Sequence, residues 1–179
     1  MSRYLKWAQK EYPLRTRIPV SLLAGVLFLI LFPYLLLVTC PSVDRQLGFH
    51  PFDAGATSYI IGGILTIVGL AFALWSILVQ VTRGRGTPLP MLPTQTLLTT
   101  GPFQYCRNPM TLGTILAYLG IAIAAATAVG IAAVLIFGVL LVLYLKLLEE
   151  RELAERFGEQ YLAYRREVPF ILPRRPRRK

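Results

Sequence analysis

Two polar clusters with the capacity for chemistry stand beside long apolar runs. In the stretch GPFQYCRNPM, Arg107 and Asn108 come directly before an apolar segment, while Glu149 and Glu150 come directly after one. An arginine can hold an anion through two parallel hydrogen bonds, and neighbouring carboxylates attract cations or accept protons. Taken alone, the glutamates are equally typical of a solvated helix end, because charges of both signs follow them.

An aromatic and aliphatic face follows the second cluster. Its members recur at spacings of 4, 3 and 4, which places them on one side of a helix: Phe157, Tyr161, Tyr164 and Val168. Anchoring at a membrane interface would by itself explain such a face. We expect this helix to lie on the membrane surface or to fold back over the rest of the protein.

Membrane-spanning helices must position these clusters. Of 179 residues, 55% are hydrophobic and 16% are charged, a balance that belongs to a polytopic membrane protein. At a rise of ~1.5 Å per residue, four segments have about the length that crosses a ~30 Å hydrocarbon core: residues 18–40, 58–81, 110–126 and 128–148. Small residues at 124–130 predict a tight hairpin between the last two. The sequence therefore predicts an all-α transmembrane bundle of about four spans, with residues 1–179 forming one domain.

The distribution of lysine and arginine predicts the orientation. There are five such residues in 1–17, one in 41–57, three in 82–109, none in the hairpin and ten in 146–179. Because cytoplasmic segments carry the excess of positive charge, both termini and the 82–109 connection are expected in the cytoplasm. We expect residues 1–17 to lie in the interface. The net charge of +10 gathers beside apolar runs, which favours anionic lipid headgroups over nucleic acid as the partner.

Other residue types limit the possible chemistry. Cys40 and Cys106 fall on opposite sides of the predicted membrane, so both are expected to be reduced. His50 is the single histidine, without a cysteine or carboxylate cluster around it, so we expect no metal site. The connection 83–110 is rich in proline and glycine but also carries leucine, methionine and phenylalanine. Such residues need burial, which favours an ordered loop over a linker.

Together the clusters resemble two linked motifs of small integral-membrane methyltransferases, the isoprenylcysteine carboxyl methyltransferases and the phosphatidylethanolamine-type phospholipid N-methyltransferases. The resemblance covers about residues 58–173, and the lead-in at Gly86–Pro90 is similar to bacterial members. The first motif is matched by Gly101, Pro102, Phe103, Tyr105, Arg107, Asn108, Pro109, Met110 and Gly113. The second is matched by Glu149, Glu150, Phe157, Gly158, Tyr161, Tyr164, Val168 and Pro169.

The resemblance implies a bundle that binds S-adenosylmethionine at the cytoplasmic face and methylates a membrane lipid or lipidated substrate. It implies an inner (plasma) membrane or an endoplasmic-reticulum-type membrane. Carried over by position, Glu150 and Arg107 are the expected catalytic residues, and residues 149–173 form a segment that closes over the cofactor. The expected cofactor-binding residues are Tyr105, Arg107, Asn108, Pro109, Gly113, Glu149, Glu150, Tyr161 and Tyr164.

The departures from the family pattern bear on the acceptor. Asn108 stands where carboxyl-methylating members usually carry histidine, which favours a phospholipid amine over an isoprenylcysteine carboxylate. Glu149, Glu150, Glu152 or a water molecule would then accept the amine proton. Two alternatives stay open: an NADPH-dependent, sterol-reductase-like membrane enzyme, and a non-enzymatic lipid-binding scaffold. The scaffold hypothesis predicts that the two clusters are independent surface features.

Overall fold

The computed structural model describes residues 25–50, 55–84 and 95–175, together with Arg15, Pro19, Leu22 and Leu23. Every regular element in this part of the chain is helical, which confirms the predicted all-α class. The interfacial segment predicted for residues 1–17, apart from Arg15, and the lead-in at Gly86–Pro90 lie outside the described residues.

The first helix runs from Leu27 to Gln46, past the expected end at residue 40. It alternates π and α segments, and each π segment ends two residues before a proline, Pro33 or Pro41. A proline lacks the N–H of the α-helical bond and crowds the carbonyl four residues earlier, so the turn widens there. The segments are η1 (Leu27–Leu31), α3 (Phe32–Tyr34), η2 (Leu35–Thr39) and α4 (Cys40–Gln46).

Three described helices are long and apolar enough to cross a membrane, namely Leu27–Gln46, Ala56–Arg83 and Ala128–Phe157. The span predicted at 110–126, the third along the chain, corresponds to a shorter apolar helix of 16 residues. The remaining elements are α5 (Ala56–Arg83), η3 (Gly101–Gln104), α6 (Pro109–Ala124), α7 (Ala128–Tyr144), η4 (Leu145–Glu149), α8 (Glu150–Phe157) and α9 (Glu159–Glu167). Because α7, η4 and α8 are continuous, the last span projects beyond the expected end at residue 148.

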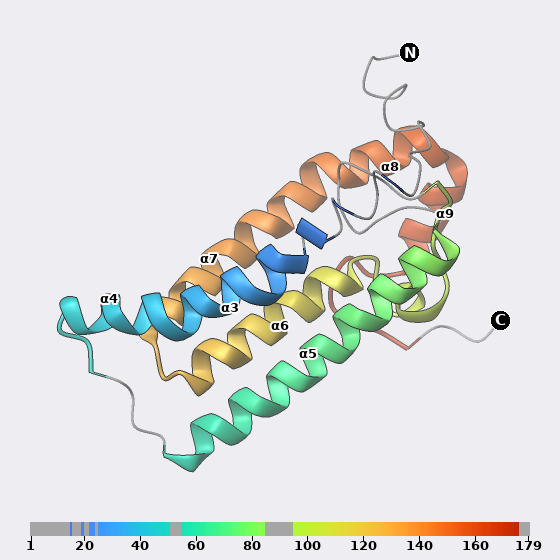
Figure 1. Ribbon diagram of the computed structural model, residues 1–179. Coiled ribbons are helices and arrows are strands. Elements are labelled where there is room, and N and C mark those ends of the chain that lie inside the picture. Colours follow the sequence, from blue (N-terminus) through green and yellow to red (C-terminus); the bar gives the residue numbers. More distant parts are fainter. Residues whose placement is uncertain are drawn as a thin grey trace.

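The short helix α6 lies between α5 and α7 (Figure 1). Glycines bring α5 and α6 into backbone contact, since a Cβ added at Gly113 would lie 2.6 Å from both Ala73 N and Gly69 O. Such close approach lets membrane helices gain packing contacts without large side chains. On the other side of α6, Tyr118 stacks on Phe32 with ring centroids 5.7 Å apart, and its hydroxyl donates to Phe28 O over 2.7 Å.

The outer faces of the long helices are apolar and exposed. Ile67 on α5 and Leu140 on α7 are 69% and 60% exposed, and similar side chains continue along both helices. An apolar surface of this extent is unfavourable in water and suits contact with lipid tails. The long helices therefore present lipid-facing surfaces, while α6 is largely enclosed.

Asp44 on α4 connects the first helix to the turn between α6 and α7 through hydrogen bonds. It is 5% exposed, accepts a hydrogen bond from Val129 N over 2.9 Å, and accepts another from the Thr127 hydroxyl. Thr127 also caps α7 by accepting from Gly130 N over 3.0 Å. The tight hairpin predicted at 124–130 is this turn, and its anchor to the first helix is a buried carboxylate.

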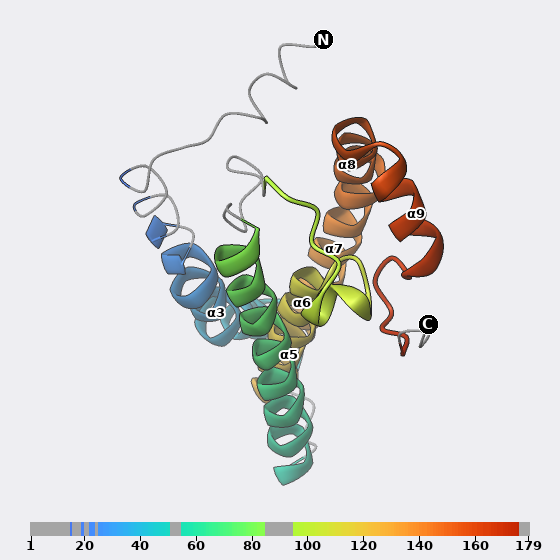
Figure 2. The same ribbon diagram turned by 90° about the vertical axis from the view of Figure 1, so that its right-hand side faces the viewer.

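The opposite end carries α8, α9 and the chain around η3, and we call it the polar end (Figure 1). Here the predicted continuous aromatic helix is interrupted at Gly158, whose φ of +51° ends α8 and begins α9. Only glycine adopts this conformation readily. The break turns α9 back beside the chain that leads into α6, as Figure 2 shows.

Candidate functional site

The segment 101–108 is held in a fixed path at the polar end. Gly101 has a φ of +64° and starts the η3 turn, whose Pro102 and Phe103 are buried. Cys106 is 0% exposed, and burial raises the pKa of its thiol to about 11. Pro109 occupies the first turn of α6, where its missing N–H costs no hydrogen bond. The loop therefore presents Arg107 and Asn108 from an ordered backbone, and the part of the predicted ordered loop at residues 85–94 lies outside the described residues.

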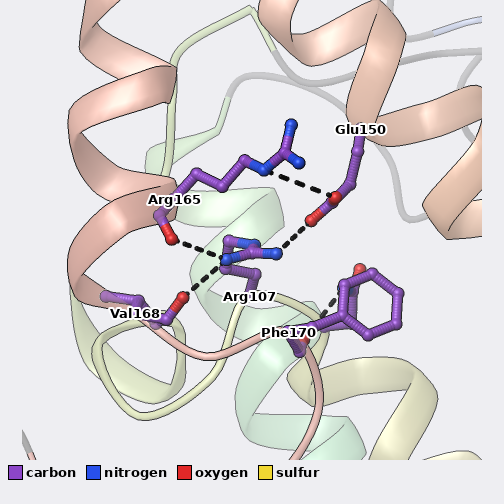
Figure 3. Close-up of polar contacts among 6 residues, drawn as sticks. Arg107, Glu150, Arg165, Val168 and Phe170 are labelled. Atoms are coloured by element: carbon purple, nitrogen blue, oxygen red, sulfur yellow. Dashed lines mark hydrogen bonds and ion pairs between the residues drawn. The ribbon is translucent and has the colours of Figure 1, made fainter.

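Arg107 is the hub of the site (Figure 3). Its Nη2 forms an ion pair with Glu150 Oε1, and both side chains are nearly buried. Its Nη1 donates to Arg165 O over 2.9 Å and to Val168 O over 2.7 Å. Its Nε is buried without a hydrogen-bond partner. One guanidinium thus joins the two polar clusters and retains a donor that an additional acceptor can satisfy.

Residues 168–174, the C-terminal strap, pair with the segment before α6. Arg107 N donates to Pro169 O over 2.9 Å, and Arg174 N donates to Tyr105 O over 3.0 Å. Asn108 donates to Phe170 O twice, from its backbone N over 3.2 Å and from Nδ2 over 3.0 Å. The Asn108 side chain, expected to bind a cofactor, holds the strap in this structure.

Two tyrosines of α9 close the site from the other side. Tyr161 is 1% exposed, and the Tyr164 hydroxyl donates to Phe103 O over 2.6 Å. Burial raises the pKa of both hydroxyls, and the Glu150 carboxylate raises that of Tyr161 further. Both hydroxyls therefore stay protonated at neutral pH and act as hydrogen-bond donors.

The carboxylates of the second cluster have different surroundings. Glu150 lies next to two guanidinium groups, since Arg165 Nε is 3.8 Å from its Oε2 in addition to the Arg107 pair. Glu149 forms no ion pair with any residue that the structure describes. The site therefore combines one carboxylate that is paired with arginine and one that has no ion-pair partner among the described residues.

These groups surround a cavity of about 70 Å³. Its polar lining consists of six residues that the sequence predicted and one amide that it did not: Arg107, Asn108, Glu149, Glu150, Tyr161, Tyr164 and Gln80. Its apolar lining consists of Leu97, Leu98, Phe103, Leu145, Leu153 and Phe157. Pockets for cofactor-sized ligands usually measure about 300–1,000 Å³. A ligand of that size requires the cavity to widen.

Three of the expected site residues are not in the cavity lining. Tyr105 lies beside Trp75, with ring centroids 6.2 Å apart. Pro109 begins α6, and Gly113 sits in the contact between α5 and α6. Their predicted cofactor contacts stay predictions, and the roles visible here are in packing.

Sequence reasoning missed Gln80, which enters the cavity from α5. Its Oε1 is buried and has no hydrogen-bond partner. An amide three residues from the end of an otherwise apolar span was the available signal. No group of three or more potential metal-ligating side chains occurs in the described part of the chain.

Comparison with known proteins gives one family. Residues 57–160 match the phospholipid methyltransferase family. This range runs from the second residue of α5 to the second residue of α9 and contains both polar clusters. No curated protein and no solved structure gives a significant match to the chain.

Proposed function

Since this chain belongs to the phospholipid methyltransferase family, we propose that it transfers a methyl group from S-adenosylmethionine to the amine headgroup of a membrane lipid. The proposal places the reaction at the polar end, on the cytoplasmic side of the membrane. The observation that carries it is the meeting of both polar clusters at one cavity, where Arg107 pairs with Glu150. A scaffold with two independent surface clusters would not bring these residues together.

The donors and acceptors at this cavity fit the proposed cofactor. S-adenosylmethionine has a carboxylate, an ammonium and a sulfonium, and when bound it supplies a methyl group that is activated by the positive sulfur. Arg107 Nε is a buried donor without a partner, which suits the carboxylate. The Glu150 carboxylate suits the cationic end of the cofactor. Tyr161 and Tyr164 line the same cavity, and because the Tyr164 hydroxyl already donates to Phe103 O, its oxygen is left to accept a hydrogen bond from the ligand.

The protein's part in such a transfer is to orient the two substrates and to exclude water. The apolar residues of the cavity wall, among them Leu145 and Leu153, remove water from the reacting groups. An amine must lose a proton in the course of its methylation. We assign the acceptance of that proton to Glu149, because its carboxylate has no ion-pair partner among the described residues, whereas Glu150 is neutralised by Arg107.

The location supports a lipid acceptor. The cavity lies where the lipid-facing helices α5 and α7–α8 end, and Leu147 and Leu148, next to Glu149, are 65% and 59% exposed. A headgroup at the membrane surface can therefore reach the cavity while its acyl chains stay among the helices' outer apolar faces.

Methyl transfer from labelled cofactor into a total lipid extract tests the proposal. The purified protein in lipid–detergent micelles should label amine phospholipids, and the label should survive mild base, which hydrolyses methyl esters. Glu150→Gln should lower the rate by about tenfold to a hundredfold, since a charge-assisted contact is removed. The matched control Glu155→Gln changes a half-exposed carboxylate on the same helix and should leave the rate unchanged. Base-labile label, or none, would contradict the proposed function.

A further inference from the structure

Gln80 stands out among the polar residues in the half of α5 that is nearer the polar end. The hydroxyls of Ser76 and Thr82 donate to the carbonyl oxygens four residues earlier, over 2.7 and 2.6 Å. The Oε1 atom of Gln80 has no such partner, although it is buried. Its neighbours Leu78 and Val81 are 61% and 56% exposed on the lipid-facing side, whereas Gln80 lines the cavity.

A buried carbonyl oxygen without a hydrogen bond is uncommon in proteins and destabilises the fold. A leucine at this position would continue the apolar helix without that cost. The unpaired oxygen is therefore best explained by a ligand group that binds it. An amide oxygen only accepts hydrogen bonds, so the complementary ligand group must carry an N–H or O–H.

The other polar side chains at the cavity limit the kind of ligand group that Gln80 can bind. Glu149 lines the same cavity and has no ion-pair partner in the described ranges, while Arg107 is already paired with Glu150. Gln80 on α5 and Glu149 on η4 thus offer two acceptors from different helices. A carboxylate ligand would face like groups there, whereas an amine would donate to both.

We propose that Gln80 is an acceptor-binding residue that selects among lipid amines by receiving a hydrogen bond from an N–H of the nitrogen to be methylated. This inference rests on the proposed function. Primary and secondary amines keep an N–H in their reactive, uncharged form, and tertiary amines have none. Gln80 thereby favours the first two methyl additions over a third. It acts by positioning the nitrogen, and Glu149 receives the proton.

Three phospholipids with identical acyl chains, bearing a primary, a secondary or a tertiary amine headgroup, test this assignment. For each lipid in mixed micelles, kcat/KM is measured with labelled S-adenosylmethionine, and the cofactor Kd is measured by calorimetry. Gln80→Met keeps the size of the side chain and removes the acceptor oxygen. It should lower kcat/KM about fivefold to tenfold for the primary and secondary amines, the usual effect of one lost hydrogen bond. The value for the tertiary amine and the cofactor Kd should not change.

Two further variants complete the test. Gln80→Glu keeps an acceptor oxygen and should retain the discrimination against the tertiary amine. Thr82→Val changes an exposed hydroxyl two residues away on α5 and should match the wild type. Equal losses on all three lipids in Gln80→Met, or no loss at all, would overturn the role of Gln80 but leave the proposed function intact. Failure of the wild type to methylate any of the three lipids would overturn both.

Discussion

Replacing Arg107 by methionine tests how the C-terminal strap (residues 168–174) is held against the site. Methionine keeps an unbranched apolar stem but lacks the guanidinium that bonds to the carbonyl oxygens of Arg165 and Val168. The Glu150 side chain, 8% exposed, then loses its nearly buried partner and keeps only the half-exposed Arg165, whose Nε is 3.8 Å from Oε2. The strap keeps its backbone pairing but loses its connection to α8.

The expected change in the free energy of strap opening follows from the loss of the Arg107–Glu150 ion pair. Removing one partner of a buried ion pair destabilises by about 3–5 kcal/mol, because the other charge stays buried. Since about 1.4 kcal/mol corresponds to a factor of ten in an equilibrium constant, opening of the strap should become about a hundredfold to several thousandfold more frequent.

Cys106 reports this opening directly. It is 0% exposed, and the strap bonds to the residues on both sides of it, Tyr105 and Arg107. Because burial raises the pKa of its thiol to about 11, the thiol is also protonated at pH 8 while the strap is closed. Alkylation in a Cys40→Ser background, followed by mass spectrometry in detergent micelles, measures how often the thiol becomes accessible.

The wild type should react slowly and Arg107→Met faster by the factor given above. Arg151→Met is the matched control, since Arg151 lies on α8 with its side chain 80% exposed and pairs with Glu155 at the surface. Equal alkylation rates in wild type and Arg107→Met would refute the role of Arg107 as the hub. So would rapid alkylation of the wild type at the rate of a free thiol.

Three other substitutions test the framework around the site. Gly113→Ala should lower the free energy of unfolding by about 1–3 kcal/mol, because the added Cβ forces α5 and α6 apart. The control Gly63→Ala has open space around it and should leave the stability unchanged. Thermal unfolding in detergent compares the two variants. Asp44→Ala should lower the free energy of unfolding by about 1–3 kcal/mol, because Val129 N and the Thr127 hydroxyl lose their acceptor. An unchanged unfolding temperature would contradict this anchoring. Gly158→Ala strains a backbone with φ of +51°, at a cost of about 1–3 kcal/mol. It should accelerate the alkylation of Cys106 without changing the α-helical circular dichroism. An unaltered alkylation rate would contradict the role of this turn.

The helices and the meeting of the two clusters could be predicted because they follow from length and hydropathy. The charge-free run 58–81 became α5, Ala56–Arg83, with two additional residues at each end. Two antiparallel helices joined by a tight hairpin bring the start of one beside the end of the other. Arg107 and Glu150 therefore had to approach each other, although their separation in sequence is 43 residues.

The details within the site depend on contacts that side-chain patterns do not encode. Spacing places Phe157, Tyr161 and Tyr164 on one face but does not indicate that Gly158 reverses the chain between them. Backbone pairing of Asn108 with Phe170 joins segments 62 residues apart, and nothing in either segment specifies the other. Gly113 belongs to a family motif, but its contact with α5 depends on glycines of a different helix.

The most direct test of the account is the affinity of the detergent-purified protein for S-adenosylmethionine, measured by calorimetric titration beside NADPH. We expect one S-adenosylmethionine site per chain, weakened at least tenfold in Glu150→Gln and unchanged in Glu155→Gln, with no binding of NADPH. Binding of NADPH alone, or S-adenosylmethionine binding that is indifferent to Glu150, would contradict it.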